Sequence, residues 1–354
     1  MLHQPLRILV TGGAGFIGAN FLHLMVPRFP ETTIVNLDKL TYAGNLQSLR
    51  AIESAPNYTF VHGDICDLDL LQRLFAQYGF TTVVHFAAES HVDRSIHAPI
   101  DFVKSNVEGT VFLLQAARAA WSGSDQQQYR FLHVSTDEVF GALGASGKFT
   151  IDTTYAPRSP YAASKAAADH FVRAYSTTYN LPVVISNCSN NYGPFQFPEK
   201  LIPLAIVRAL EMAPIPVYSR GENVRDWLHV EDHCEALALM LHCGLNGETY
   251  LVGGSGECSN LELLRLLLTI VDEELDRPEG TSWSLITFVK DRPGHDYRYA
   301  IDASKLITDL GWKPDHTLAA GLRTTVRWYL ANRPWLKAVM DESYRTYLQK
   351  QYSE

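Results

Sequence analysis

The sequence predicts an α/β fold: a doubly wound parallel sheet of the dinucleotide-binding type, followed by a smaller α/β domain. Two observations predict it. Short apolar segments rich in β-branched residues alternate with longer helical patterns in the first half of the 354-residue chain, as in right-handed βαβ units. After about Asn190 the alternation becomes less regular, and prolines interrupt it between residues 194 and 216.

The elements follow in order along the chain. A strand is expected at residues 7–11, a helix from the glycine-rich turn after it to about Met25, and a second strand from residue 33 that ends at Asp38. The remaining predicted elements are strands at 58–62, 82–86, 130–135 and 183–186, helices at 102–120 and 161–179, and a surface loop at 273–282.

The predicted boundary between the two domains lies at about residue 190: residues 1–190 form a dinucleotide-binding domain and residues 191–354 a substrate-binding domain, with some later segments returning to the first domain. The two parts together form a chain large enough for a sizeable core. In open parallel sheets, ligands bind at the carboxyl ends of the strands. The functional residues are therefore expected at strand ends.

Charge and hydropathy exclude several classes of partner. The formal charge of −8 argues against a nucleic-acid or anionic-membrane binder, since phosphate backbones are bound mainly by Lys and Arg. No stretch approaches the roughly 20 apolar residues that cross a bilayer, and the amino-terminal residues do not resemble a leader. We therefore expect a cytoplasmic protein that binds small molecules.

The five cysteines are scattered and form no Cys-x-x-Cys pair, so reduced thiols are expected. The pairs His233-Cys234 and His242-Cys243 suggest a metal at first sight. On a helix, however, a spacing of nine residues puts the two pairs on opposite faces. No metal site is predicted.

A glycine cluster follows the first predicted strand. Gly12, Gly15 and Gly18 have the G-x-x-G-x-x-G spacing, which brings the backbone close to a pyrophosphate at the start of a helix. Asp38, at the end of the second strand, would accept the ribose hydroxyls and repel a 2′-phosphate, which favours NAD over NADP, although Lys39 beside it weakens that discrimination. A structural turn with a solvent-facing aspartate is the alternative. The other predicted cofactor contacts are Phe16, Ile17, Asp64, Ile65, Ala87 and Ala88.

Tyr161 and Lys165 are four residues apart and hence on the same face of a helix. The charge of Lys165 is expected to lower the pKa of Tyr161, and the lysine to hold the nicotinamide ribose. Tyr161 would then act as general base on a sugar hydroxyl. Alone, this spacing is common by chance. The upstream glycine cluster, and Thr136 at a strand end between the two, favour catalysis.

At these residues the sequence resembles the extended short-chain dehydrogenase/reductase family, whose members act on nucleotide sugars, and the resemblance covers essentially the whole chain. It implies that Thr136, Tyr161 and Lys165 form the catalytic set. Further stretches that carry the resemblance are residues 36–45, 85–94, 187–194, 197–203, 225–228 and 291–296.

Asp137 and Glu138 indicate which branch of the family the sequence resembles. The epimerases of the family carry small or polar residues at these two positions. Elimination of water needs one acid and one base. The resemblance implies a nucleotide-sugar 4,6-dehydratase in which Glu138 removes the proton of carbon 5 and Asp137 protonates the leaving 6-hydroxyl. A 4-epimerase is the alternative. So is a non-enzymatic NAD-binding protein, although it would not need Tyr161 and Lys165.

The nucleotide diphosphate is expected on Arg225, Arg292 and His295, which offer charge-assisted hydrogen bonds. Tyr297 stands where the dehydratase pattern most often has arginine, and His229 and Phe140 stand where it has tyrosine, so a thymidine and a uridine nucleotide both stay open. The remaining predicted substrate contacts are Ser90, Asn190, Glu199, Lys200, Leu201 and Asn260.

The two long predicted helices, 102–120 and 161–179, are apolar over more than one face, as in the run from Val111 to Leu114. Such excess apolar surface indicates a partner. The resemblance implies a homodimer formed by a four-helix bundle.

Overall fold

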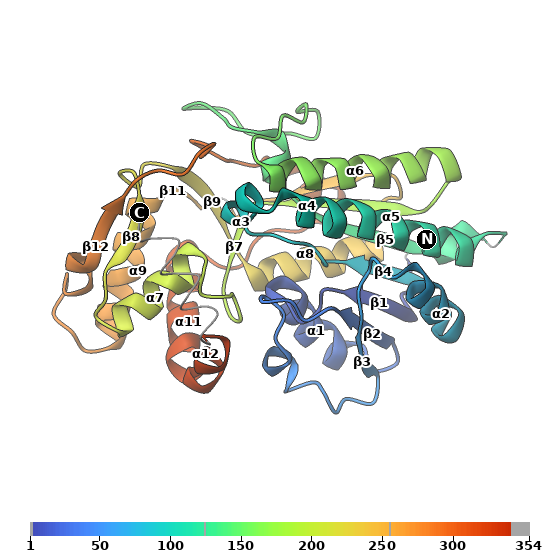
Figure 1. Cartoon of the computed structure of the whole chain (residues 1–354), viewed down its shortest axis with the longest axis horizontal. Coiled ribbons are helices and arrows are strands. Elements are labelled where there is room, and N and C mark those ends of the chain that lie inside the picture. Colours follow the sequence, from blue (N-terminus) through green and yellow to red (C-terminus); the bar gives the residue numbers. More distant parts are fainter. Residues whose placement is uncertain (1–2, 124, 255, 341–354) are drawn as a thin grey trace.

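The computed structural model describes residues 3–123, 125–254 and 256–340 (Figure 1). The predicted second domain extends to residue 354, so its last stretch, 341–354, lies outside the described residues. Seven strands form the central sheet in the order β10-β6-β5-β4-β1-β2-β3, and all of its neighbours are parallel. The strands are β1 (Arg7–Thr11), β2 (Thr33–Asp38), β3 (Tyr58–His62), β4 (Thr82–His85), β5 (Arg130–Thr136), β6 (Val183–Cys188) and β10 (Thr249–Val252).

The strand order reverses between β1 and β4, where the chain builds outward first to one side and then to the other. The carboxyl ends of β1, β2 and β5 carry Thr11, Asp38 and Thr136. A crevice opens at such a switch point because the crossover helices on its two sides lie on opposite faces of the sheet. The topology therefore places the sequence-predicted site residues at one edge.

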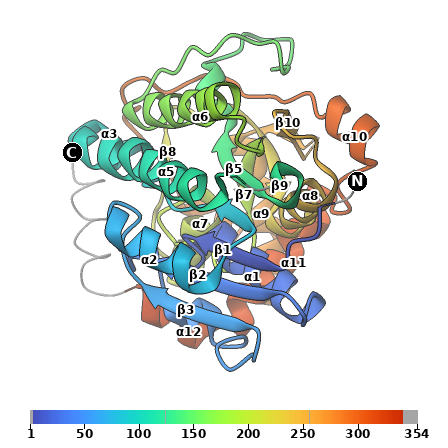
Figure 2. The same cartoon turned by 90° about the vertical axis from the view of Figure 1, so that its right-hand side faces the viewer.

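Helices cover both faces of this sheet (Figure 2). On one face, α1 and α8 pack against apolar side chains such as Ile8 and Val84. On the other, α2, α5 and α6 pack against side chains such as Leu9 and Val83. These helices span α1 (Phe16–Arg28), α2 (Leu68–Tyr78), α5 (Gly109–Trp121), α6 (Pro160–Tyr179) and α8 (Val230–Cys243). Both faces are buried, which explains why the strands read as continuous apolar runs.

The second half has its own core, built around side chains such as Tyr192, Leu267 and Tyr329. Its strands form a three-stranded sheet, β11-β9-β7, and a two-stranded sheet, β12-β8. The bounds are β7 (Asn190–Tyr192), β8 (Ile215–Tyr218), β9 (Val224–His229), β11 (Glu257–Ser259), β12 (Ile286–Val289), α7 (Leu201–Leu210), α9 (Asn260–Glu274), α10 (Ser304–Leu310), α11 (Leu318–Ala331) and α12 (Arg333–Val339). Between these elements in the sequence, α8 packs on the central sheet and β10 belongs to it, so the division at residue 190 remains a prediction.

The helix predicted at residues 102–120 contains a π-helical segment. The short helices α3 (Val92–His97) and α4 (Pro99–Phe102) are followed by a π-helical segment, Val103–Glu108, before α5 begins at Gly109. The wide turn holds Asn106, whose buried amide donates to Ser164 Oγ at 2.8 Å and to Glu89 O at 2.9 Å. Such local widening is frequent at functional sites, and periodicity alone does not reveal it.

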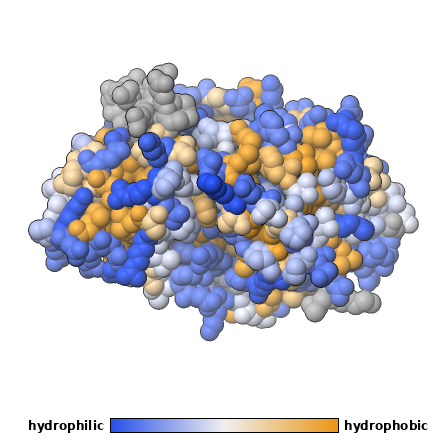
Figure 3. All heavy atoms as spheres, turned by 90° about the horizontal axis from the view of Figure 1, so that it is seen from below, coloured by the Kyte–Doolittle hydropathy of each residue, from blue (hydrophilic) through white to orange (hydrophobic). Residues whose placement is uncertain are grey.

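No helix in the described ranges is long and apolar enough to cross a bilayer. Seen from below, the surface carries apolar areas over both halves, each bordered by hydrophilic residues (Figure 3). Large apolar side chains are also exposed on the helices at the top of Figure 1, among them Ile100 and Phe171, which are 62% and 41% exposed.

Candidate active site

A cavity lies at the carboxyl edge of the central sheet, over the switch point between β1 and β4. All predicted cofactor contacts and all predicted catalytic residues line it. They are Gly12, Gly15, Phe16, Ile17, Gly18, Asp38, Lys39, Asp64, Ile65, Ala87, Ala88, Thr136, Asp137, Glu138, Tyr161 and Lys165. Of the predicted substrate contacts, Ser90, Asn190, Glu199 and Lys200 line the same cavity.

The glycine loop is shaped by close backbone contacts. Gly12 has φ +74°, and a Cβ there would lie 2.5 Å from the amide nitrogen of Ala87. A Cβ on Gly18 would lie 2.4 Å from the carbonyl oxygen of Gly12. Helix α1 begins directly after Gly15 without an acidic residue in its first turn and without a side-chain cap from the described residues. Its first N–H groups are therefore left for an anion such as a diphosphate.

Asp38 is fixed at the end of β2 by two backbone amides. Its carboxylate accepts from Ala14 N and from Leu40 N, each at 2.8 Å. Lys39 turns away from it and forms an ion pair with Asp64, 2.7 Å between Nζ and Oδ2. Asp64 thus compensates the charge of Lys39, which had weakened the preference for an unphosphorylated ribose. The end of β2 therefore suits a ribose with a free 2′-hydroxyl.

Thr136, Tyr161 and Lys165 come from the end of β5 and the first turns of α6, and all three are buried. Ser159 begins this helix as its N-cap, with Pro160 next to it, a favoured start. Lys165 Nζ donates to the carbonyl oxygen of Val134 at 2.9 Å. The helix start therefore presents the phenol and the ammonium group to the strand end.

The expectation that Lys165 lowers the pKa of Tyr161 is wrong for this structure. Burial raises the pKa of Tyr161 well above its ordinary value, and the charge of Glu138 raises it further. A hydrogen bond with Thr136 is the contact that opposes this rise. The lysine is itself desolvated, and its own pKa is lowered by burial. Burial dominates for both groups because each charged form loses its water.

Asp137 and Glu138 begin the short 3₁₀ turn that follows β5. Burial raises the pKa of Asp137 well above its ordinary value, and the charge of Glu138 adds to that rise. Burial also raises the pKa of Glu138, but the charges of Arg292, Lys200 and Arg225 partly offset that rise. The two neighbouring carboxyl groups thus have unequal surroundings: Asp137 favours the protonated acid, and Glu138 has cations that favour the carboxylate.

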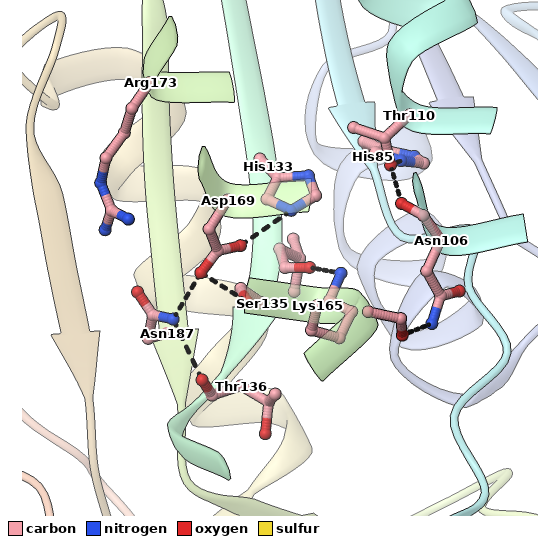
Figure 4. Close-up of polar contacts among 12 residues, drawn as sticks. His85, Asn106, Thr110, His133, Ser135, Thr136, Lys165, Asp169, Arg173 and Asn187 are labelled. Carbon is pink, nitrogen blue, oxygen red and sulfur yellow. Dashed lines mark hydrogen bonds and ion pairs between the residues drawn. The ribbon is translucent and has the colours of Figure 1, made fainter. Parts of the chain in front are cut away.

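A buried polar network lies behind these residues (Figure 4). Asp169, one turn after Lys165 on α6, accepts at Oδ2 from Ser135 Oγ (3.0 Å) and Asn187 Nδ2 (3.2 Å). The same oxygen accepts from Tyr155 OH at 2.7 Å. Its other oxygen lies 3.1 Å from His133 Nε2. Burial would raise the pKa of Asp169, but the hydrogen bond with His133 and the charges around it lower the pKa below its usual value.

The network extends to the catalytic residues on both sides. Asn187 Nδ2 also donates to the carbonyl oxygen of Thr136 at 3.0 Å. The charge of Asp169 is the largest influence that opposes the lowered pKa of Lys165. Asp169 therefore holds the strand end in place and stabilises the protonated lysine without lining the cavity itself.

On the far side of the cavity, Glu199 is buried among polar groups. Tyr42 OH donates to its Oε1 at 3.2 Å, and Arg94 Nε lies 3.6 Å from its Oε2. Burial raises the pKa of Glu199 to about 7. The adjacent Lys200 donates to the carbonyl oxygen of Ser90 at 3.0 Å. This wall joins segments of both halves of the chain and offers both donors and acceptors to a ligand.

Comparison with known proteins gives the family. The GDP-mannose 4,6 dehydratase family profile matches residues 9–325. The chain belongs to that family. A dTDP-glucose 4,6-dehydratase of Xanthomonas campestris is 54% identical over 95% of this chain and 97% of its own length. That of Salmonella typhimurium is 49% identical over 98% of this chain and 99% of its own length.

Solved structures agree in fold. A dTDP-glucose 4,6-dehydratase from Bacillus anthracis in complex with NAD has a TM-score of 0.85 and 44% identity, covering 94% of this chain and 99% of the other. The UDP-glucose 4-epimerase of Thermus thermophilus in complex with NAD has a TM-score of 0.81 but 29% identity, covering 92% and 99%. The fold is thus shared by dehydratases and epimerases, so side chains have to separate the two activities.

Five predicted substrate contacts of this family member do not line the cavity: Leu201, Arg225, Asn260, Arg292 and His295. Arg225 donates to the carbonyl oxygens of Val224 and Asp296 at 2.8 and 3.0 Å, and Arg292 pairs with Asp93 at 3.0 Å. The charges of Arg225 and Arg292 still offset part of the rise that burial causes in the pKa of Glu138. Their contact with a substrate stays a prediction.

The cavity also includes residues that sequence analysis did not name. Gly44 lies beside Asp38, where a Cβ would approach Oδ1 at 3.0 Å. Its segment, 36–45, carries the family resemblance and was the available signal. The other unnamed lining residues are Leu37, Thr41, Ala43, Gly63, Phe86, Glu89, Ser105, Val134, Ser135, Cys188, Ser189, Asn191, Gln196 and Phe197.

Proposed function

We propose that the chain is an NAD-dependent dTDP-glucose 4,6-dehydratase, a hydro-lyase of deoxysugar biosynthesis that forms dTDP-4-keto-6-deoxyglucose. The observation that carries this proposal is the convergence of Asp137 and Glu138 with Tyr161 in one cavity, because elimination needs an acid and a base that an epimerase does not use. The curated relatives that are about half identical over nearly the whole chain bear the same name.

NAD fits the residues present. The uncapped start of α1 suits its diphosphate, Asp38 its adenosine ribose, and Lys165 its nicotinamide ribose. When bound in its oxidised form, NAD brings a positive charge that favours the phenolate of Tyr161, accepts hydride from carbon 4 of the sugar and returns it to carbon 6.

Tyr161 takes the proton of the 4-hydroxyl as carbon 4 is oxidised to the ketone. The ketone acidifies carbon 5, so that Glu138 removes its proton while Asp137 protonates the departing 6-hydroxyl, which leaves as water. Glu138 then returns its proton to carbon 5. Tyr161 ends with one proton more and Asp137 with one fewer. Thr136 bridges them, through its hydrogen bond with Tyr161 and through Oγ, which donates to Asp137 Oδ1 at 3.3 Å.

The test follows a label. The protein is incubated with dTDP-glucose that carries deuterium at carbon 4, and the product is analysed by mass spectrometry and NMR. Loss of one water with deuterium at carbon 6 is expected. An epimer of unchanged mass would establish the 4-epimerase instead. A parallel incubation with UDP-glucose decides the nucleotide: turnover of UDP-glucose at an equal or higher kcat/KM would contradict the proposed thymidine preference.

Two glycine substitutions should separate cofactor binding from stability. Gly18→Ala drives a methyl group into backbone of the loop, 2.4 Å from the Gly12 oxygen, and is expected to cost about 1–3 kcal/mol of unfolding free energy. In Gly15→Ala the nearest atom would lie 3.3 Å away, so stability should change by less than about 1 kcal/mol while NAD binding weakens about tenfold or more. Thermal unfolding and calorimetric NAD titration measure the two effects. Equal NAD affinity of Gly15→Ala and wild type would contradict this cofactor site.

Asp169→Asn should shift the pH dependence of turnover. The variant removes the charge that opposes desolvation of Lys165, so the pKa of Lys165 falls further. A lysine that acts while protonated loses its proton as pH rises through that lowered pKa, and the alkaline limb of kcat should move to lower pH. Asp101→Asn, an exposed change on α4, is the control. An unchanged alkaline limb in Asp169→Asn would show a purely structural role.

We also propose a homodimer, through the exposed apolar side chains on α4, the π-helical segment and α6. Ile100, Val103 and Phe171 are 62%, 50% and 41% exposed, and these elements pack side by side (Figure 1). Ile100→Glu should yield a monomer in analytical ultracentrifugation at micromolar concentration. A monomeric wild type would disprove the dimer.

The five cysteines are free, which supports the proposed cytoplasmic location.

A further inference from the structure

Three ligand-type side chains converge away from the cavity. His229 ends β9, Glu231 lies in the first turn of α8, and His316 lies just before α11. Their nearest ligand atoms all lie within 4.8 Å of one another. Glu231 Oε2 is 3.9 Å from His229 Nδ1 and 3.6 Å from His316 Nε2, and the two rings stack with centroids 4.1 Å apart.

His229 is the unusual member of the group. Its side chain is 0% exposed, and neither ring nitrogen has a hydrogen-bond partner among the described residues. Tyr192 packs edge-on against the ring, with centroids 5.3 Å apart. A buried imidazole without a partner for its polar atoms is costly. A ligand held at Nδ1 would satisfy one of its two nitrogens.

His316 is already oriented as a metal ligand. Its Nδ1 lies 2.8 Å from Asp232 Oδ1, and its backbone N–H donates to Asp232 Oδ2 at 3.1 Å. A carboxylate that accepts from one ring nitrogen fixes the tautomer and leaves the other nitrogen as a lone-pair donor. Here that other nitrogen, Nε2, faces Glu231. The side chains of His316 and Glu231 are 24% and 54% exposed, so an ion reaches them from solvent.

We propose that His229, Glu231 and His316 bind a divalent transition-metal ion of the zinc class, with Asp232 as the supporting acceptor. Two imidazoles and one carboxylate are a donor set that Zn²⁺ takes in four-coordinate sites, with water as the fourth ligand. Bond lengths of about 2.0–2.2 Å put ligand atoms about 3.4 Å apart. The separations of 3.6 and 3.9 Å between Glu231 and the two rings close to that value when the exposed carboxylate adjusts. The separation between the two ring nitrogens, within 4.8 Å, closes when the partly exposed His316 ring moves as well.

The charged groups that face the two histidines are Glu231 and Asp232 from α8, and these two carboxylates favour a cation beside the rings.

The ion would tie three segments together at the junction of the two halves. β9 pairs with β7, and Tyr192 of β7 is the register partner of His229. Asn190 and Asn191 of the same short strand line the active-site cavity. A metal that fixes β9 to α8 and to the segment before α11 would thus stiffen the strand behind the substrate wall. This inference does not depend on the proposed function.

The site is tested on the full-length protein without an affinity tag, after dialysis against a chelator. Titration with Zn²⁺ by calorimetry and with Co²⁺ by visible absorption should give one ion per chain. Excess Zn²⁺ should raise Tm by a few degrees. Glu231→Gln and His316→Ala should each weaken binding about tenfold or more. The control Glu235→Gln removes a carboxylate one turn further along α8, where it pairs with Arg28, and should bind like wild type.

Two outcomes would overturn the proposal. The first is less than about one tenth of an ion per chain at a hundredfold excess of Zn²⁺. The second is unchanged affinity in both variants, which would assign the ion to other ligands such as the free cysteines. Circular dichroism and the Tm of the metal-free variants verify that they are folded. His316→Ala alters a partly exposed side chain and is therefore preferred to a change at the buried His229.

Discussion

Tyr161→Phe is expected to lower kcat about 10²- to 10⁴-fold, with little effect on stability. The substitution removes one oxygen atom and keeps the ring, which is buried at the start of α6. Without the phenol, the proton of the 4-hydroxyl has no acceptor when carbon 4 is oxidised. Single-turnover absorbance of the reduced cofactor should therefore rise more slowly by the same factor, because the first step is affected.

A matched control is Tyr179→Phe. Tyr179 ends the same helix and is 44% exposed, so its hydroxyl should not affect turnover. Since burial raises the pKa of Tyr161 and lowers that of Lys165, the wild-type rate of the oxidation step should increase with pH until Lys165 loses its proton. A Tyr161→Phe variant that oxidises carbon 4 at more than about one tenth of the wild-type rate would show that another base takes the proton.

The fold could be predicted from sequence because its signals are local. Residues 7–11 and the stretch from 33 to Asp38 read as buried strands because both faces of the sheet are covered, and the structure has β1 and β2 there. The glycine spacing likewise reports a contact over a few residues, between Gly12 and Gly18. In a parallel sheet the carboxyl ends of all strands lie at one edge, so the topology places Asp38 and Thr136 at the same edge of the central sheet.

Other parts of the site depend on contacts between distant segments. The ion pair of Lys39 with Asp64 and the network on Asp169 join different strands and helices, and no periodicity encodes them. The pKa of Tyr161 was predicted in the wrong direction because spacing reports the neighbouring charge but not the loss of water. The sequence did not reveal the histidine cluster because its residues come from distant segments: Asp232 and His316 are 84 positions apart.

Glu138→Gln is expected to stop elimination while leaving the oxidation of carbon 4 nearly intact. Glutamine keeps the shape of the side chain but cannot accept the carbon-5 proton, so water loss should fall about 10²- to 10⁴-fold. The reduced cofactor and a 4-keto sugar of unchanged carbon 6 should then accumulate in stoichiometric amounts. Absorbance at the cofactor band and mass spectrometry of the quenched sugar measure both.

Asp137→Asn separates the acid from the base. In this variant Glu138 still removes the carbon-5 proton, so the 4-keto sugar should exchange that proton for deuterium in D₂O although the 6-hydroxyl does not leave. Glu138→Gln should show neither exchange nor elimination. Burial raises the pKa of both carboxyl groups, but the charge of Glu138 raises that of Asp137 further, whereas three cations oppose the rise at Glu138. These unequal surroundings predict this order of roles. Exchange in Glu138→Gln combined with its loss in Asp137→Asn would reverse the assignment, since proton exchange at carbon 5 requires the base but not the acid.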